Sequence, residues 1–320
     1  MADLAKTPFV KELASSDKKI RDKATESLAL FLRSKTDLSL LELLKLWKGL
    51  FFCFYHSDRP LTQQALARNL SYTLVPSLPR STVHRFLRAF WITIGREWHN
   101  IDRIRLDKYL LLIRSYVGVA FQIFLKDNST STSTQSNGTN KKRKREEAKS
   151  SKKRSKSKKP TTEDDEDEEK GQQETPNDTT DSAYPALKTY LEIIAEGPLA
   201  PLNFDPNQPK ADEKNGIIPM PHGPDGLRYH VLDIWIDEIE KNLEIDPESG
   251  KPVENVPFEL LLSPVENLRK ESPHKPVRVR AQETLDDERL VEWGVRERKV
   301  SVVEEEEESS DEEWGGFGDD

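Results

Sequence analysis

Three neighbouring residues, His56, Ser57 and Asp58, are the residue types of a hydrolytic triad. A triad works through hydrogen bonds between side chains that distant parts of a fold bring to one point, so consecutive residues do not form it. A histidine at the end of a helix, followed by a Ser-Asp turn, explains these letters better. We therefore expect no nucleophilic catalysis at this position.

Asp102 and Asp107 could supply two carboxylates for acid–base chemistry. They are better explained as a helix N-cap and as an ion partner of Arg103 or Lys108. One cysteine and six histidines are too few and too scattered for a zinc site. The sequence has no GxxxxGK(S/T) motif and no GxGxxG after a strand. We predict a protein that is not an enzyme and that holds no metal and no cofactor.

Segregated charge is the stronger signal. Residues 1–126 hold 21 Lys and Arg against 11 Asp and Glu, and residues 141–159 hold 12 against 2. Residues 304–320 hold 10 acidic residues and no basic one, and the whole chain carries −8. This separation is typical of a basic body that binds a partner, and the first candidate is a polyanionic nucleic acid.

The basic segment at residues 141–159 has the pattern of a bipartite nuclear-import signal that importin would bind. Its residues are Lys141, Lys142, Arg143, Lys144 and Arg145, followed after a spacer by Lys152, Lys153 and Arg154. The alternatives are a solvated charge run and a sequence-independent contact with RNA phosphates. We favour nuclear import.

A second basic group belongs to an amphipathic helix expected around residues 83–98. At about 100° per residue, Arg85, Arg88 and Arg96 fall opposite its apolar face. Such a charged face is ordinarily only solvated. Because Glu97 is almost the only acid near it, phosphate binding is an equally good interpretation.

The acidic segment at residues 304–320 allows three interpretations: solubility, mimicry of nucleic acid, and phosphorylation. Ser309 and Ser310 precede Asp-Glu-Glu, which is a casein-kinase-type pattern. Trp314 and Phe317 stand among glycines in the same segment. Because a solubilising tail rarely needs tryptophan, these two aromatics indicate a short docking motif.

Helices must position these side chains. Apolar residues spaced by three and four predict six helices within residues 1–126. Their expected boundaries are Thr7-Pro8 for the first, Ser16 as cap of the second, Asp37 or Ser39 at the start of the third, Pro60 for the fourth, residues 83–98 for the fifth and Asp102 before the sixth. Short connections between them favour an all-α fold, a HEAT/armadillo-like helical solenoid of antiparallel helix pairs.

Composition divides the chain into four parts. They are a helical-repeat body at residues 1–126, a disordered basic and acidic linker at 127–182, a region of helices and extended segments at 183–295, and a disordered acidic tail at 296–320. The linker holds too little apolar surface to offset the entropy of ordering. The helices of the third part, near residues 184–196 and 227–243, are too few to bury a core and are expected to dock on the body.

Smaller features complete the prediction. Residues 258–262 suggest a short helical turn, residues 277–280 alternate Val with Arg in a weakly strand-like way, and residues 282–293 suggest a last short helix. The apolar runs at residues 38–55 and 109–125 are interrupted by charged side chains, which are costly in a bilayer. With one cysteine and no signal sequence at the N-terminus, we expect a soluble intracellular protein without a membrane partner.

Two strings resemble the nucleolar ribosomal RNA processing protein 1 family. One is LWKGLFF at residues 46–52 with HSDRPL at residues 56–61, and the other is REWHNIDRIRLDKY at residues 96–109. The resemblance implies an all-helical, non-catalytic assembly factor in the nucleolus, a scaffold of early pre-60S particles that is needed for pre-rRNA processing around the internal spacers. The implied partners are other assembly factors, ribosomal proteins and pre-rRNA.

The resemblance does not identify residues that bind RNA. Trp47, Trp91 and Trp98 are better explained as core side chains. The charged residues within the two strings could form structural ion pairs or contact rRNA, and they are Arg59, Arg103, Arg105 and Lys108. Two other functions remain open: a nuclear helical-repeat adaptor and an acidic-tailed chaperone, neither with direct RNA contact.

Overall fold

A computed structural model describes residues 8–135, 184–202, 208, 210–212, 217–253 and 255–297, with side chains described at 11–126 in the first range. The predicted import signal and most of the predicted linker lie outside the described residues. So do Ser309, Ser310, Trp314 and Phe317 of the acidic segment.

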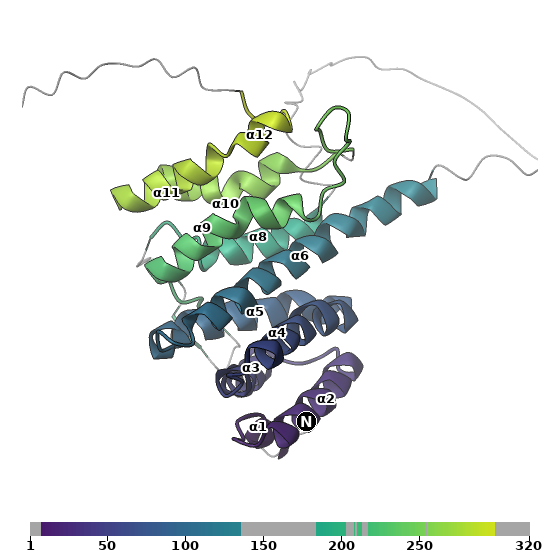
Figure 1. Ribbon diagram of the computed structural model, residues 1–320, viewed down its shortest axis with the longest axis vertical. Coiled ribbons are helices and arrows are strands. Elements are labelled where there is room, and N and C mark those ends of the chain that lie inside the picture. The colour runs from purple at the N-terminus through teal and green to yellow at the C-terminus, as the bar shows by residue number, and fades with distance from the viewer. Residues whose placement is uncertain are drawn as a thin grey trace, which may run out of the picture.

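Antiparallel helix pairs stack into a solenoid (Figure 1). The pairs are α1 (Pro8–Leu13) with α2 (Lys18–Ser34), α3 (Leu40–Tyr55) with α4 (Pro60–Arg68), α5 (Arg80–Glu97) with α6 (Leu106–Gln135), α8 (Pro185–Glu196) with α9 (Asp225–Glu240), and α10 (Phe258–Glu271) with α11 (Lys275–Leu285). The short α12 (Glu288–Glu292) follows. The predicted all-α solenoid is confirmed: across the described ranges, the chain forms helices and two isolated β-bridges but no strand.

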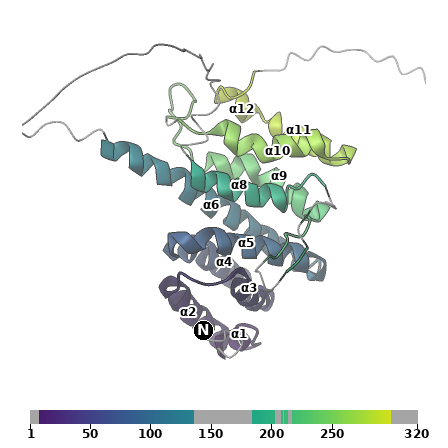
Figure 2. The ribbon, with the colours of Figure 1, turned by 180° about the vertical axis from the view of Figure 1, so that it is seen from behind.

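The stack has two rows of helices. α1, α3, α5, α8 and α10 follow one another in the first row, and α2, α4, α6, α9 and α11 form the second. Seen from behind, α8 lies beside α5 and α6 (Figure 2). α9 also packs on α6, where the rings of Phe121 and Trp235 meet edge to face at 5.0 Å. The segments before and after residues 136–183 therefore share one hydrophobic core.

Aromatic side chains fill the space between α3, α5 and α6. Trp47 is 1% exposed, and its Nε1 donates a hydrogen bond to the Phe86 carbonyl at 3.1 Å. Phe90 stacks on Tyr116 with ring centroids 4.0 Å apart. Aromatic pairs of this kind add about 0.5–1.5 kcal/mol beyond the burial of their area. The core positions predicted for Trp47 and Trp91 are confirmed, whereas Trp98 is only partly buried.

Local signals decide where several helices begin. Ser39, rather than Asp37, caps α3 through a capping box in which its hydroxyl accepts from the Glu42 N–H and Glu42 accepts from the Ser39 N–H. α2 begins after Asp17, whose carboxylate accepts from the Lys19 N–H, so the expected cap at Ser16 was one residue early.

One prediction for the C-terminal region was wrong, and another was right about the helix but too short. Residues 277–280 are part of α11, because Val277, Ala281 and Leu285 lie four residues apart and bury one helix face. The expected short turn at residues 258–262 is the start of the longer α10, which continues through Pro264. The carbonyl of Leu260, which loses its backbone donor to the proline, accepts a hydrogen bond from the Ser263 hydroxyl instead.

The long helix α6 continues to Gln135, so the helix extends into the segment expected to be a disordered linker. Adding a residue to an existing helix needs no new nucleation, which explains growth into a Ser/Thr-rich sequence. By length and composition its segment Leu106–Lys126 could also cross a membrane. Most of it is buried by neighbouring helices, which is the behaviour of a core helix.

Candidate nucleic-acid interface

The two strings that carry the family resemblance meet in space. Asp58, in the turn between α3 and α4, accepts hydrogen bonds from Arg105 Nε at 3.0 Å, Arg105 Nη2 at 2.9 Å and Lys108 Nζ at 2.9 Å. Asp102 accepts from Arg105 Nη1 at 2.5 Å and from the Tyr55 hydroxyl at 2.9 Å. We call these five residues the Asp58 clamp. It ties the α3–α4 turn to the start of α6.

The clamp buries the charge of Lys108 and leaves Asp58 partly exposed. Hydrogen bonds from Arg105 and Lys108 lower the pKa of Asp58 from 3.8 to about 2. Burial lowers the pKa of Lys108, whose side chain is 2% exposed, although Asp58 opposes this shift. The Lys108 ammonium also donates to the carbonyls of Tyr55 at 2.8 Å and Ser57 at 3.1 Å. All three N–H donors of Lys108 are used inside the protein, and Arg105 is paired with Asp58 and Asp102. Of the two alternatives predicted for Arg105 and Lys108, structural ion pairs and contacts with rRNA, the structure favours the ion pairs.

Arg85 and Arg88 also have partners within the fold. Arg85 donates to the carbonyls of Leu38 at 2.8 Å and Thr36 at 3.0 Å, in the segment that leads into α3. Arg88 forms a bidentate pair with Glu196 at 2.6 and 2.7 Å, which links α5 to α8. Both guanidinium groups are half-buried. Arg85 therefore joins α5 to the segment before α3, and Arg88 joins α5 to α8.

Arg59, Arg96 and Arg103 face solvent. No ion pair is formed by these three within the ranges that the structure covers. Arg59 directly follows Asp58 and Arg103 lies two residues before Arg105, so both flank the Asp58 clamp. Arg96 is in the last turn of α5, where the neighbouring Glu97 pairs with Lys48 at 2.5 Å. These exposed arginines are the basic groups of the two strings that remain available to a ligand.

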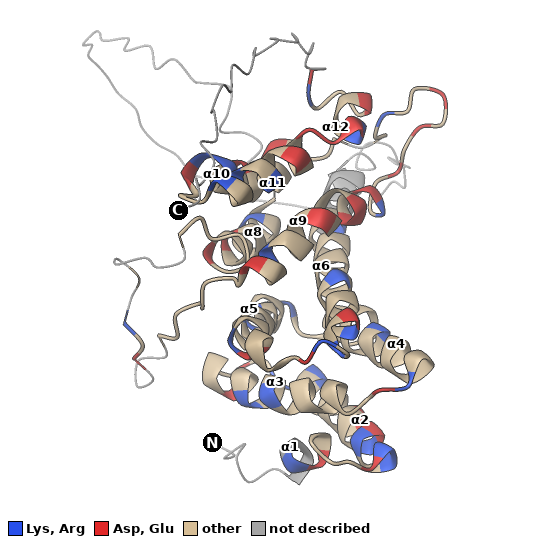
Figure 3. Ribbon diagram, turned by 60° about the vertical axis from the view of Figure 1, so that its left-hand side comes forward, with Lys and Arg blue, Asp and Glu red and all other residues tan. Residues whose placement is uncertain are grey.

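The stack is electrically polarised along its length. Residues 1–126 carry 21 basic and 11 acidic side chains, whereas residues 184–297 carry 13 basic and 23 acidic ones. Figure 3 shows this as blue on the helices around α2, α3 and α5 and more red around α9 and α12. From Arg59 to Arg96 the sequence has six arginines and neither Asp nor Glu. A polyanion would therefore be attracted to the N-terminal half.

Two features were not predicted from the sequence. Glu238 is 1% exposed and accepts from Arg114 Nε and Lys241 Nζ, both at 2.6 Å, while Arg114 Nη2 also pairs with Asp237 at 2.7 Å. A carboxylate on an apolar stripe was the available signal, because Glu238 shares its helix face with Trp235. This network joins α6 to α9.

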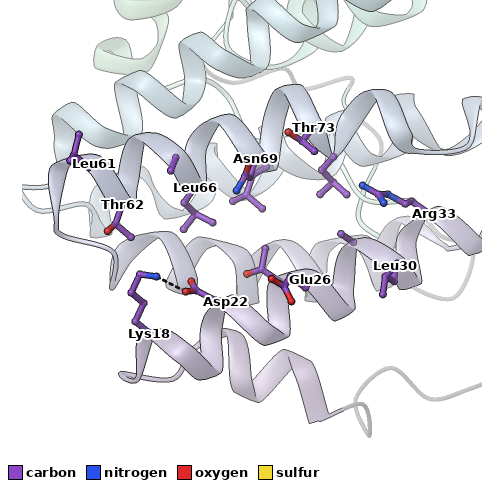
Figure 4. Close-up of a pocket in the computed structure, with 15 residues that line it drawn as sticks. Lys18, Asp22, Glu26, Leu30, Arg33, Leu61, Thr62, Leu66, Asn69 and Thr73 are labelled. Atoms are coloured by element: carbon purple, nitrogen blue, oxygen red, sulfur yellow. Dashed lines mark hydrogen bonds and ion pairs between the residues drawn. The ribbon is translucent and has the colours of Figure 1, made fainter.

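The second feature is a groove of about 730 Å3 between α2 and α4 (Figure 4). Its walls are the face of α2 that carries Asp22, Glu26 and Leu30 and the facing side of α4 and of the π-helical turn Asn69–Thr73. Only a three-dimensional arrangement reveals this groove. Among the described residues, no cluster of His, Cys, Asp or Glu could hold a metal ion.

Comparisons with known proteins agree with the family resemblance carried by the two strings. The model of the family described as "Nucleolar protein, Nop52" matches residues 4–140 and 213–316, which is most of the chain. Ribosomal RNA processing protein 1 homolog B of Homo sapiens is 28% identical over 242 residues, covering 74% of this chain and 23% of that protein. Homolog A of Homo sapiens is 36% identical over 120 residues, covering 36% and 26%.

Homolog B of Mus musculus is 39% identical over 130 residues, which cover 39% of this chain and 18% of that protein. The chain thus spans about a quarter or less of the length of these relatives. The family match confirms the predicted nucleolar localisation. The chain belongs to the Nop52 family of nucleolar proteins, the ribosomal RNA processing protein 1 family that its sequence resembles.

Proposed function

We propose that this protein is a non-catalytic scaffold of early large-subunit precursor particles that supports pre-rRNA processing. The names of its relatives, ribosomal RNA processing protein 1 homologs, support the process. The observation that carries the scaffold role is the polarity of one continuous helical stack. Its basic N-terminal half suits RNA, and its acidic C-terminal half suits basic proteins.

Direct contact with RNA would use the three exposed arginines, Arg59 and Arg103 beside the Asp58 clamp and Arg96 at the end of α5. Guanidinium groups bind phosphates through paired hydrogen bonds, and such contacts position a protein on RNA without reading its sequence. The clamp fixes the backbone on either side of Arg59 and Arg103, so the positions of these side chains are restricted before RNA binds. Less conformational entropy is then lost on binding.

Charge reversal tests this proposal. We expect the double change Arg96→Glu and Arg103→Glu to weaken association with large-subunit precursor particles in sedimentation, without lowering the melting temperature. In vitro binding to pre-rRNA should become less dependent on salt. The magnitude of the slope of log K against log salt should decrease by roughly 0.7–0.9 for each phosphate contact removed. Arg85 and Arg88 are unsuitable for this test because their reversal would also disturb the fold.

A matched control is Lys251→Glu, which reverses an exposed basic residue in the acidic half of the chain. It should leave co-sedimentation unchanged. If the Arg96/Arg103 variant co-sediments and binds RNA like the wild type, the RNA-contact proposal is wrong. The protein would then fit the alternative of a nuclear adaptor without RNA contact. The other alternative, an acidic-tailed chaperone, predicts that deletion of residues 304–320 abolishes function.

A further inference from the structure

The groove between α2 and α4 is an opening in the second row of helices. The apolar residues that line it are Ala29, Leu30, Leu61, Ala65, Leu66, Leu70 and Leu74. Leu30 is 66% exposed and Leu61 is 81% exposed, although both are large aliphatic side chains. Elsewhere in this row, α4 packs on α6, α6 on α9, and α9 on α11. An apolar surface left open in an otherwise closed row indicates a docking site.

The charges around the groove indicate which ligand it suits. The α4 wall belongs to the stretch without Asp or Glu between Arg59 and Arg96, and Arg68 is exposed next to the lining residue Asn69. On α2, Lys19 and Lys23 are exposed beside the lining residues. The charged residues that line the groove itself balance, since Asp22 pairs with Lys18 and the charge of Glu26 stands against that of Arg33. The excess of basic residues therefore comes from the rim formed by Lys19, Lys23 and Arg68. The groove therefore suits a segment with apolar anchors and flanking acidic residues.

One segment of this chain has that chemistry. Residues 304–308 are all glutamate, and Asp311, Glu312 and Glu313 immediately precede Trp314. Gly315 and Gly316 separate Trp314 from Phe317. We propose that Trp314 and Phe317 dock into the α2–α4 groove of the same chain, with the preceding acidic residues against the basic rim. This inference concerns the chain alone and does not depend on contact with RNA.

The connecting chain is long enough. The last described residue, Glu297, follows α12 at the end of the stack opposite α2 (Figure 1). Helix axes in packed rows lie about 8–10 Å apart, so the steps from α12 back to the groove amount to roughly 35–45 Å. The 16 residues from 298 to 313 span at most about 53–58 Å when extended, at ~3.3–3.6 Å per residue. An extended path along the stack reaches the groove.

The family match extends into this segment and includes Trp314, although it ends one residue before Phe317. The match runs from residue 213 to residue 316 and does not stop where the described helices end. Trp314 therefore lies in the part of the chain that the family model covers. A segment that serves only as a solubilising tail would need no aromatic residue there.

Fluorine NMR of the full chain labelled with 5-fluorotryptophan tests the proposal. Replacement of Trp314 by Phe assigns its resonance among the six tryptophans, and a labelled peptide of residues 304–320 gives the undocked position. We expect the Trp314 resonance of the full chain to be displaced from the peptide position. The displacement should be lost in Leu61→Glu, which adds a charge to the groove at an exposed position.

Ile104→Glu is the matched control, because Ile104 is 92% exposed and does not line the groove. It should leave the displaced resonance in place. Two results would overturn the proposal: a Trp314 resonance at the peptide position in the wild type, or a displacement that Leu61→Glu does not alter. A displacement that grows with protein concentration would show that a second copy supplies the segment, and it would overturn docking within one chain.

Discussion

Replacement of Asp58 by Asn tests whether the Asp58 clamp holds the two family strings together. The amide keeps the size of the carboxylate but removes its charge. The amide oxygen can still accept from Arg105 Nε and Lys108 Nζ, but without a negative charge, and the NH2 group that replaces Oδ2 cannot accept from Arg105 Nη2. Arg105 keeps the carboxylate of Asp102, whereas the almost fully buried ammonium of Lys108 keeps only uncharged acceptors, namely the amide oxygen and the carbonyls of Tyr55 and Ser57.

The expected loss is about 1–3 kcal/mol. Hydrogen bonds to charged groups contribute roughly 1.5–3 kcal/mol each. The Asp58 side chain is 54% exposed, so solvent screening reduces its share, and the two carbonyls retain part of the stabilisation of Lys108. For a folded region of about 150–250 residues, 1 kcal/mol corresponds to about 2–4 °C, so melting should fall by several degrees. Urea unfolding followed by circular dichroism would measure the free energy directly.

The pH dependence gives a second readout. The pKa of Asp58 is about 2 in the folded protein and 3.8 ordinarily, so its contribution to stability is fully present above pH 4 and is lost as pH falls towards 2. The stability difference between wild type and Asp58→Asn should therefore shrink over this window. Asp107→Asn is the control, an exposed carboxylate on the same helix end. Equal stabilities for both variants, or a difference constant down to pH 2, would refute the role of the clamp.

Two further substitutions test the packing of the stack. Gly118→Ala should cost about 1–3 kcal/mol, because its added Cβ would collide with the Tyr72 hydroxyl and lie 2.5 Å from the buried Glu238 Oε2. The double variant Gly118→Ala with Tyr72→Phe should regain part of that loss in thermal unfolding, and no recovery would argue against the collision. Ser39→Ala should cost about 0.5–2 kcal/mol by removing one half of the capping box of α3, whereas Ser39→Asp should retain most of the stability.

The helices could be predicted from the sequence because their signals are local. Apolar residues spaced by three and four mark α5, and the pairing of Ser39 with Glu42 marks the start of α3. The prediction failed at α11, where alternating Val and Arg at residues 277–280 suggested a strand. A helix forms there because Val277 packs into a core supplied by other helices, and tertiary packing overrides the weak β preference of valine.

The candidate site was less predictable because its side chains find their partners far along the chain. The residues of the two strings were identified, but the role of Arg88 depends on Glu196, which lies 108 residues away. Lys108 had an even choice between an ion pair and RNA, and its burial beside Asp58 decides for the ion pair. The groove between α2 and α4 depends on how these two helices are placed relative to each other, which the spacing of residues in the sequence does not reveal.

The central proposal is that the basic half of the stack contacts pre-rRNA. Ultraviolet crosslinking of the full chain in purified large-subunit precursor particles, followed by mass spectrometry of peptide–RNA adducts, tests it most directly. We predict adducts on peptides that contain Arg59, Arg96 or Arg103, and none on the acidic half at residues 225–297. Particles that contain the protein but yield no adduct within residues 1–126 would contradict the proposal.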